Sequence, residues 1–215
     1  MAASRTYGQL CGLAISLDLV GERWTLLLIR ELARGPKRFR DLLDGLEGIG
    51  TNLLSARLKS LEAAGVIERV TLPPPSGAPA YALGPRGLTL EPILEELALW
   101  GIDFIDEETA GYRARAAWAA MSMRARMDRE ESRPPNGTFA FKVEDESFWL
   151  SVSDEGSSIR DGSPPADPDV SVEVDRDGFF AIATGSSTPS QAGALVEGDD
   201  ASLSSLLHTF RLPQR

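Results

Sequence analysis

The stretch GIGTNLLSARLKSLEAAGVIERV, residues 48–70, decides the fold of the first half of this 215-residue chain. Its apolar residues recur at the three- and four-residue spacing of one helix face, as Leu54, Leu58 and Leu61. Thr51 is placed to cap the start of this helix, and Gly65 is placed to end it in a left-handed conformation. After Gly65 the apolar period changes to two. The stretch therefore predicts a helix followed by a β-strand.

Similar patterns surround this stretch. Helical spacing predicts further helices over about residues 10–20, 24–32, 38–44 and 88–107. The segment AYAL, residues 80–83, is expected to return as the second strand of a hairpin, across the Pro-rich loop at residues 72–79. A short helix, a turn, a second helix and a hairpin together make a winged helix-turn-helix, in which the second helix lies in the major groove of DNA.

The outward face of the second helix is unusual for a surface helix, because it lacks long Glu side chains. We expect it to present Asn52, Ser55, Ala56, Lys59, Ser60 and Ala63. Small residues let a helix backbone approach base edges, Asn can pair with adenine, and Lys can reach guanine or phosphate. The alternative is a small face that packs on another subunit or on the second domain.

Basic residues gather around this helix although the whole chain has a net charge of -10. Residues 1–72 hold ten Lys and Arg against eight Asp and Glu, whereas residues 130–215 hold six against sixteen. The acidity is therefore a property of the C-terminal part, which would repel DNA or simply keep the protein soluble. The predicted DNA-binding residues are Arg38, Arg40, Thr51, Asn52, Ser55, Arg57, Lys59 and Arg69, with Arg57 able to reach either phosphate or a core acid.

Residues 10–105 resemble the HxlR-type branch of the MarR-like winged-helix transcription regulators. The features that match are Gly21 with Trp24, REL at Arg30–Leu32, GPKRF at Gly35–Phe39, and IGTNLLSARLKSLEAAGVIER at Ile49–Arg69. The resemblance implies sequence-specific binding to double-stranded DNA, commonly repression, and a homodimer that pairs through its terminal helices. Two features depart from the family: the wing loop Pro73–Ala80 lacks Lys and Arg, and LGPRG stands before the last helix. Near the wing, Arg69 and Arg86 remain the candidates for contact with DNA.

Cys11 lies where this family often has a cysteine just before the first helix, which in some members senses oxidants or electrophiles. Gly12 follows it here in place of the usual proline. Two interpretations stay open: an exposed redox-sensing thiol, or a small, partly buried residue within a helix, which we favour. As the only cysteine it suits a reducing cytosol, and the chain shows neither an export signal nor an apolar run long enough to span a membrane.

The C-terminal part predicts a second domain of α+β type. A helix is expected over residues 110–133, and TFAFKV, SFWLSV, VSVEV and GFFAIA are expected as strands of an antiparallel sheet, closed by a helix over about residues 202–210. The Pro134–Gly137 turn separates the first of these helices from the sheet. The fold class is thus α+β, with a winged-helix domain at residues 1–108 and a second domain at residues 109–215.

Residues 114–212 resemble the sterol-carrier-protein (SCP2-like) fold, through the strand pairs, the passage ADPDVSVEVDRDGFFAIATG, and GALVEGDDASLSSLL before the last helix. The resemblance implies an apolar tunnel for lipids in some members and only a packing role in others. The residues that could line such a cavity are Phe139, Phe141, Phe148, Trp149, Phe179, Phe180, Ile182, Leu206 and Leu207. The alternative is that they fill an ordinary core.

Enzyme chemistry has little support in the sequence. His208 is the only histidine and Cys11 the only cysteine, so a metal site or a Cys–His pair would need distant parts of the chain to meet. We expect no catalytic residue, metal or cofactor. The sequence therefore predicts a cytoplasmic, homodimeric DNA-binding repressor that responds to a small hydrophobic effector. The alternative is a lipid-binding protein that uses its winged helix only to form dimers.

Overall fold

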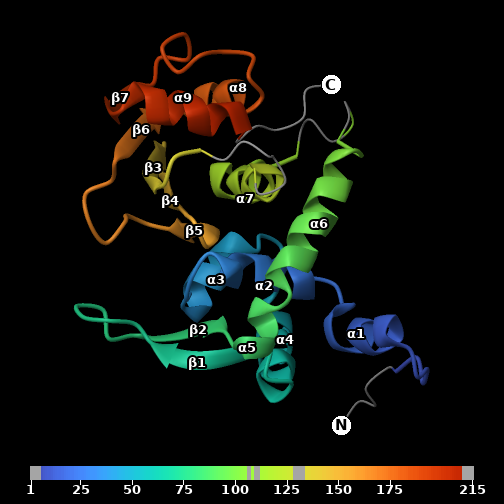
Figure 1. Ribbon diagram of the computed structural model, residues 1–215. Coiled ribbons are helices and arrows are strands. Elements are labelled where there is room, and N and C mark those ends of the chain that lie inside the picture. Colours follow the sequence, from blue (N-terminus) through green and yellow to red (C-terminus); the bar gives the residue numbers. More distant parts are fainter. Residues whose placement is uncertain (1–5, 106–107, 109–111, 128–133, 210–215) are drawn as a thin grey trace. The chain divides into compact units, whose positions relative to one another are not determined.

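The computed structural model describes residues 6–105, 108, 112–127 and 134–209, and the chain divides into two compact units, residues 1–94 and 95–215 (Figure 1). A separate cluster of buried apolar side chains fills each unit. Helices and a two-stranded hairpin build the first unit, whereas a five-stranded sheet forms the centre of the second. The α+β fold class is confirmed.

The first unit has the order of elements that defines a winged helix. They are α1 (Gly12–Val20), α2 (Thr25–Ala33), α3 (Phe39–Gly45), α4 (Thr51–Ala63), β1 (Ile67–Thr71), β2 (Pro79–Leu83) and α5 (Pro85–Leu88). The next helix, α6 (Glu91–Ile102), begins in the first unit and continues into the second. β1 and β2 pair antiparallel, and Lys37 just before α3 forms an isolated bridge with Tyr81 of β2. The predicted stripe of leucines on α4 is fully buried against α2 and α3, as Leu54, Leu58 and Leu61. This burial fixes which face of α4 remains outside.

Two details of the predicted helices are wrong. Gly50, not Thr51, is the N-cap residue of α4, and Thr51 is the first residue inside the helix. The helix predicted over residues 88–107 begins only at Glu91, as α6, because Pro92 has no backbone N–H with which to continue the short helix α5 beyond Leu88. It ends at Ile102, and residues 106–107 lie outside the described residues.

A buried ion pair lies at the C-terminal end of α2, where α3 packs against it. Glu31 and Arg34 are both almost fully buried, and a carboxylate oxygen of Glu31 lies 2.6 Å from a guanidinium nitrogen of Arg34. Gly45 of α3 approaches this carboxylate so closely that a Cβ there would lie 3.1 Å from it. The absence of a side chain at Gly45 therefore allows the short helix α3 to pack tightly on α2.

The second unit is a sheet covered by helices. Its elements are α7 (Ala116–Met127), β3 (Gly137–Val143), β4 (Glu146–Ser153), β5 (Gly156–Asp161), β6 (Val170–Val174), α8 (Arg176–Ala183), β7 (Leu195–Gly198) and α9 (Asp200–Thr209). The strand order is β5-β4-β3-β6-β7, and every neighbouring pair is antiparallel except β3 with β6. Alternate residues of β3, β4 and β6 are buried together with the apolar sides of the three helices. The sheet thus has one apolar face, and the helices cover it.

The segment GFFAIA, which we expect as a strand, is part of helix α8. The Asp175 side chain caps this helix by accepting a hydrogen bond of 2.7 Å from the Gly178 N–H. Phe179 and Ile182, three residues apart, then face the core. The predicted helices at the two ends of this unit are confirmed as α7 and α9, but the first begins later than predicted, since residues 112–115 are not helical. Residues 109–111, 128–133 and 210 lie outside the described residues.

Candidate nucleic-acid interface

The outward face of α4 is exposed along its length. Thr51, Asn52, Ser55, Ala56, Lys59, Ser60 and Ala63 are all exposed. Within the part of the chain that the structure describes, the side chains of Asn52, Ser55 and Lys59 make no hydrogen bond or ion pair. Their polar groups are therefore available to an external partner, and the small residues between them leave the helix backbone accessible.

Two arginines open α3, beside the start of the helix-turn-helix. Arg38 is the N-cap residue of α3 and holds Asp41 through two contacts of 3.0 and 2.8 Å, while its backbone N–H donates to the same carboxylate. This carboxylate raises the pKa of Arg38, and the guanidinium lowers the pKa of Asp41. Arg40 differs from it, because its side chain is 88% exposed and lies 3.9 Å from Asp44. Arg40 is therefore the more accessible of the two for a phosphate.

Arg57 points away from the outward face of α4. Its guanidinium lies 2.6 Å from the Glu22 carboxylate and donates a longer hydrogen bond, of 3.4 Å, to the Arg23 carbonyl. The Arg57 side chain is 19% exposed. The sequence leaves two partners open for Arg57, a phosphate or an acidic side chain. In the structure its partner is an acid, Glu22, which lies in the turn between α1 and α2.

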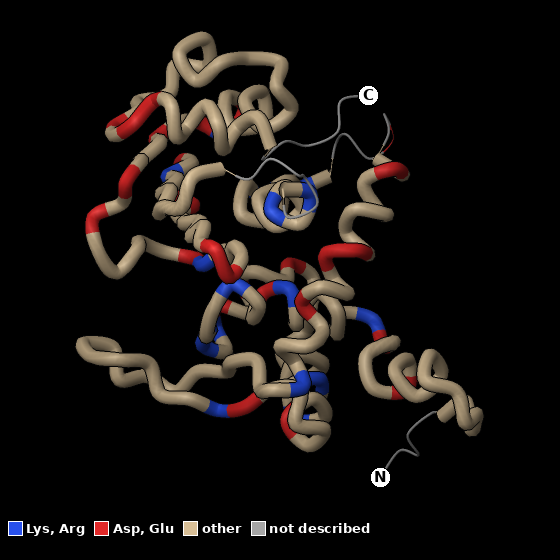
Figure 2. The backbone as a smooth tube through the Cα atoms, in the orientation of Figure 1, with Lys and Arg blue, Asp and Glu red and all other residues tan. Residues whose placement is uncertain are grey.

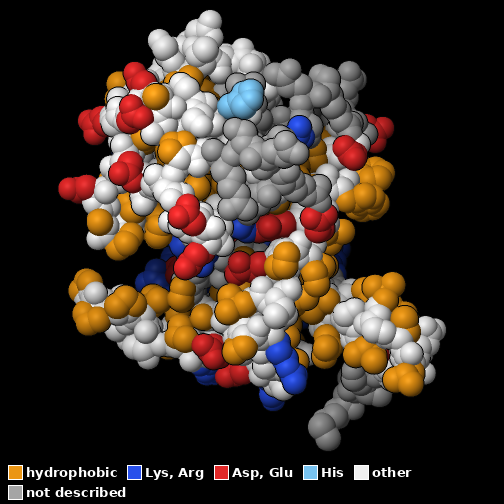
Figure 3. Space-filling model, viewed as in Figure 1, with side chains coloured by type: hydrophobic (Ala, Val, Ile, Leu, Met, Phe, Trp, Pro, Cys, Tyr) orange, Lys and Arg blue, Asp and Glu red, His pale blue; other side chains and the backbone are white. Residues whose placement is uncertain are grey.

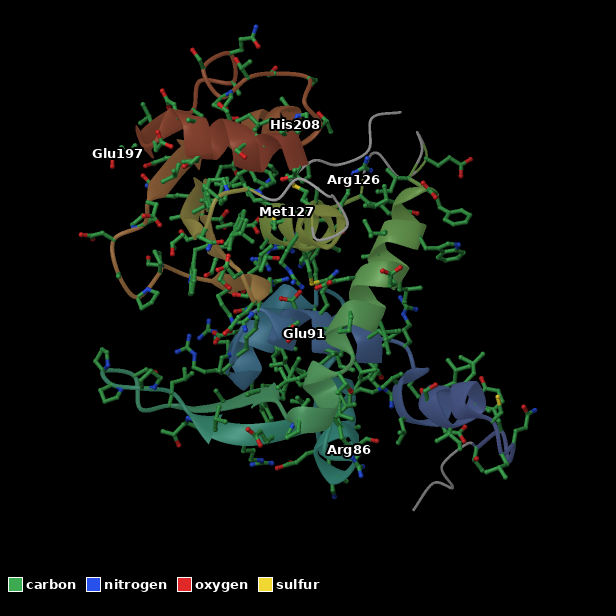
Figure 4. The ribbon with its side chains drawn as sticks, in the orientation of Figure 1. Arg86, Glu91, Arg126, Met127, Glu197 and His208 are labelled. Carbon is green, nitrogen blue, oxygen red and sulfur yellow. The ribbon has the colours of Figure 1, made fainter. Side chains whose placement is uncertain are left out.

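The arginines at the base of the wing brace the end of α4. Arg69 of β1 pairs with Glu62 at 3.0 Å and lies over the Tyr81 ring, and Glu62 raises the pKa of Arg69. Arg86, labelled in Figure 4, donates a hydrogen bond of 3.0 Å to the Ala64 carbonyl. Both guanidiniums remain largely at the surface, so each can brace α4 and still present positive charge.

Beyond its base the wing carries no Lys or Arg, and prolines occupy its tip. Pro73, Pro74, Pro75 and Pro79 are exposed, and apolar side chains cover the end of the hairpin (Figure 3). Basic positions lie instead on α3 and α4, as the tube in Figure 2 shows. In the first unit, positive charge is therefore concentrated around the helix-turn-helix rather than at the wing tip.

The acidic partners of these arginines were not predicted. Asp41 lies three residues after Arg38, and this local spacing is a signal that the sequence contains. Glu22 is 35 residues from Arg57, so nothing in the local pattern connects the two. Long-range pairs of this kind become visible only when the helices have been placed.

Cys11 is exposed and lies at the N-cap of α1, not within the helix. The interpretation of Cys11 as a partly buried helical residue is therefore wrong. The backbone N–H groups of Ala14 and Leu13, in the first turn of α1, favour a thiolate and lower the pKa of Cys11. The free first-turn N–H groups of a helix favour a negative charge at this position.

The second unit encloses a small apolar cavity beneath the loop that follows α8. Its walls are Met123, Phe141, Val172, Val174, Phe179, Ile182, Ala183, Pro189, Leu203 and Leu207. The cavity has a volume of about 10 Å³, roughly enough for one water. In this state the cavity is closed to any larger molecule.

Four of the predicted cavity residues line it, namely Phe141, Phe179, Ile182 and Leu207. Phe139, Phe148 and Leu206 are fully buried in the core around it, and Phe180 packs on that core from its edge. Trp149 follows Phe148 in β4 and therefore points to the opposite face of the sheet, where it is half-buried.

Neither a metal centre nor a membrane span is found in the described ranges. No group of three or more His, Cys, Asp or Glu residues there could hold a metal ion. Of the helices described, none is long and apolar enough to cross a bilayer.

A helix-turn-helix followed by a hairpin, with an exposed small polar face on its second helix, defines the class of winged-helix DNA-binding proteins. The chain belongs to the HxlR-like helix-turn-helix family, whose model matches residues 19–109, and it is a transcriptional regulator of this type. Residues 120–195 match the SCP-2 sterol transfer family. The two resemblances expected from the sequence are thus confirmed.

The relatives are transcriptional regulators. An uncharacterised HTH-type transcriptional regulator of Synechocystis is 34% identical over 102 residues, which cover 47% of this chain and 76% of that protein. The HTH-type transcriptional regulator YodB of Bacillus subtilis is 33% identical over 91 residues, covering 42% of this chain and 81% of YodB. A solved structure of reduced YodB is 32% identical, covers 46% of this chain and 97% of its own, and has a TM-score of 0.39.

Proposed function

We propose that this protein is a cytoplasmic, homodimeric, DNA-binding repressor in which the outward face of α4 reads base edges in the major groove. The observation that carries the proposal is the exposed polar face of α4, whose Asn52, Ser55 and Lys59 side chains make no hydrogen bond or ion pair among the described residues. Arg40 on α3 and Arg69 at the base of the wing provide accessible positive charge for the DNA backbone. In this proposal the domains are residues 1–108 and 109–215.

A gel-shift titration on the DNA upstream of the protein's own gene tests this proposal. We expect a shift that survives excess competitor DNA, and weaker binding in Lys59→Ala. If Lys59 contacts a phosphate, its loss weakens binding to all sequences and reduces the slope of log affinity against log salt by about one. Lys142→Ala is the matched control, because Lys142 is an exposed lysine of the second unit. Absence of a specific shift from an intact dimer would favour a lipid-binding protein instead.

The dimer has support in exposed apolar side chains on α1. Leu13 and Leu17 of this helix are both exposed. Figure 3 shows apolar side chains over α1. Large apolar side chains gathered on a helix surface mark an interaction site, and we assign this one to a second copy of the chain. Two copies place two α4 helices on half-sites about one helical turn apart.

The second unit is proposed to bind a small, uncharged hydrophobic effector. The walls of its cavity are entirely apolar, so a buried charge there would have no partner. Pro189 lines this cavity and also two open surface grooves of about 530 and 240 Å³. Displacement of the loop that carries Pro189 would therefore connect the closed cavity with solvent.

An effector acts on DNA binding only if it binds the DNA-bound and free states of the protein with different affinity. Titration of the full chain with the uncharged fluorophore N-phenyl-1-naphthylamine tests whether the cavity opens. Saturable fluorescence that Phe141→Trp abolishes, by filling the cavity, supports the site. Fluorescence unchanged by that substitution, with the fold intact, assigns the unit a packing role.

A further inference from the structure

The turn between α1 and α2 touches both the recognition helix α4 and the loop that leads into it. Trp24, the N-cap residue of α2, has a φ of 78°, a left-handed conformation that a bulky residue rarely adopts. Its ring packs against the turn before α4, where a Cβ on Gly48 would lie 3.6 Å from the ring. The strained conformation of Trp24 therefore persists because the surrounding contacts hold it.

Arg57 makes the second contact between this turn and α4. Its guanidinium reaches the Glu22 carboxylate at 2.6 Å and the Arg23 carbonyl at 3.4 Å. Arg57 lies near the middle of α4, and the loop beside Trp24 lies before the start of that helix. Two separated points on and before α4 are thus tied to one short turn, which limits rotation as well as translation of the helix.

We propose that Glu22 and Arg57 form a positioning clamp that fixes the direction of α4 relative to α1, and so sets the spacing of half-sites that the dimer accepts. The proposal rests on the proposed function, in which α1 joins two copies and α4 reads DNA. Arg57 is then a positioning residue, and its effect on DNA is exerted through the angle of α4.

A small change in this angle is enough to matter. The 13 residues of α4 span about 20 Å at 1.5 Å per residue. A tilt of about 10° about one end therefore moves the other end by about 3.4 Å, which is the rise of one base pair along a strand. A clamp near the middle of the helix acts against tilts of this size.

A contact between Arg57 and phosphate predicts a different set of results. If Arg57 binds DNA, Glu22→Gln releases a cation and tightens binding, whereas Arg57→Gln weakens binding to every sequence and reduces the salt slope by about one. If the two residues form a clamp, both substitutions break the same contact. Their effects on the preference for one half-site spacing are then similar, and the double variant loses no more of this preference than either single variant.

The experiment uses the full chain and an operator selected from random DNA, rebuilt as a series in which the half-site spacing varies by one base pair. For the wild type we expect about a tenfold preference for one spacing. We expect this preference to fall at least threefold in Glu22→Gln, in Arg57→Gln and in the double variant, with the salt slope unchanged. Arg57→Lys, which keeps the charge, should retain most of the preference.

Thermal unfolding of each variant shows whether it is still folded, and so separates loss of the clamp from loss of the fold. A folded variant with an unchanged spacing preference overturns the proposal. Tighter binding in Glu22→Gln also overturns it, and assigns Arg57 to phosphate. A wild type that selects no operator is a different result, because it contradicts the proposed function before the clamp is tested.

Discussion

Lys59 and Arg57 lie two positions apart on α4, yet their surroundings differ. The Arg57 guanidinium is held by Glu22 and is 19% exposed, while Lys59 is exposed and makes no ion pair among the described residues. A cation with an internal partner contributes to position, and a cation without one can neutralise a phosphate. Arg38 and Arg40 differ in degree, because Arg38 lies 2.8 Å from Asp41 whereas the exposed Arg40 lies 3.9 Å from the exposed Asp44.

At the same scale, we expect Cys11 to be alkylated at a lower pH than a cysteine in an unfolded chain. The backbone N–H groups of Ala14 and Leu13 lower the pKa of its thiol, so a larger fraction is thiolate at a given pH below the usual value. The rate of reaction with iodoacetamide, followed by mass spectrometry from pH 6 to 10, measures this pKa in the native and the urea-unfolded protein. Cys11→Ser is the control that forms no adduct, and equal midpoints in the two states would contradict the prediction.

At the scale of elements, Asp41 secures the start of α3. It accepts hydrogen bonds from the Arg38 side chain and backbone, which lower its pKa. A carboxyl group whose pKa is lower in the folded state stabilises the fold above its unfolded pKa, and this contribution is lost as the pH falls through the folded pKa.

Asp41→Ala should therefore reduce the free energy of unfolding at pH 7, by about 0.5–1 kcal/mol as for other lost helix caps. The difference from wild type should shrink below about pH 4, where aspartate ordinarily becomes protonated, because the wild type then loses the same interaction. Urea unfolding at the two pH values measures both effects. Asp44→Ala is the control, since Asp44 is largely exposed and lies 3.9 Å from Arg40. A pH-independent difference would show that the carboxylate charge is not involved.

Elements with long, regular patterns could be predicted from the sequence. The leucine stripe identifies α4, and the change of apolar period after Gly65 identifies the hairpin, because each of the two spacings recurs over several residues. The sequence predicts the segment GFFAIA as a strand because five consecutive apolar residues fit a buried strand as well as a helix, and the cap at Asp175 decides between them. At the site, exposure of α4 could be predicted, but the Glu22–Arg57 contact depends on the tertiary arrangement of distant residues.

At the scale of the whole molecule, charge and apolar surface are distributed unevenly. Residues 130–215 carry ten more acids than bases, whereas residues 1–72 carry two more bases than acids. An acidic second domain weakens non-specific attraction to DNA, so binding depends more on specific contacts made by the first. The exposed apolar residues of α1 supply the surface through which we propose that two copies combine.

Leu13→Glu should convert the dimer into a monomer and weaken operator binding at least tenfold, because one α4 then binds without the other. Sedimentation velocity measures the mass, and gel-shift titration measures the affinity. Leu195→Glu is a matched control, since Leu195 on β7 is 70% exposed and Leu13 is 69% exposed. A dimer that persists in Leu13→Glu would place the interface away from α1.

The central claim is that the outward face of α4 reads base sequence, and selection of bound sequences from random DNA tests it most directly. The wild type should enrich an inverted repeat with half-site centres about 10 base pairs apart. Because Asn pairs bidentately with adenine, Asn52→Ala should enrich the same repeat with the preference relaxed at one position of each half-site. No enriched sequence with the wild type, or an identical sequence with Asn52→Ala, would contradict the assignment of this face to base recognition.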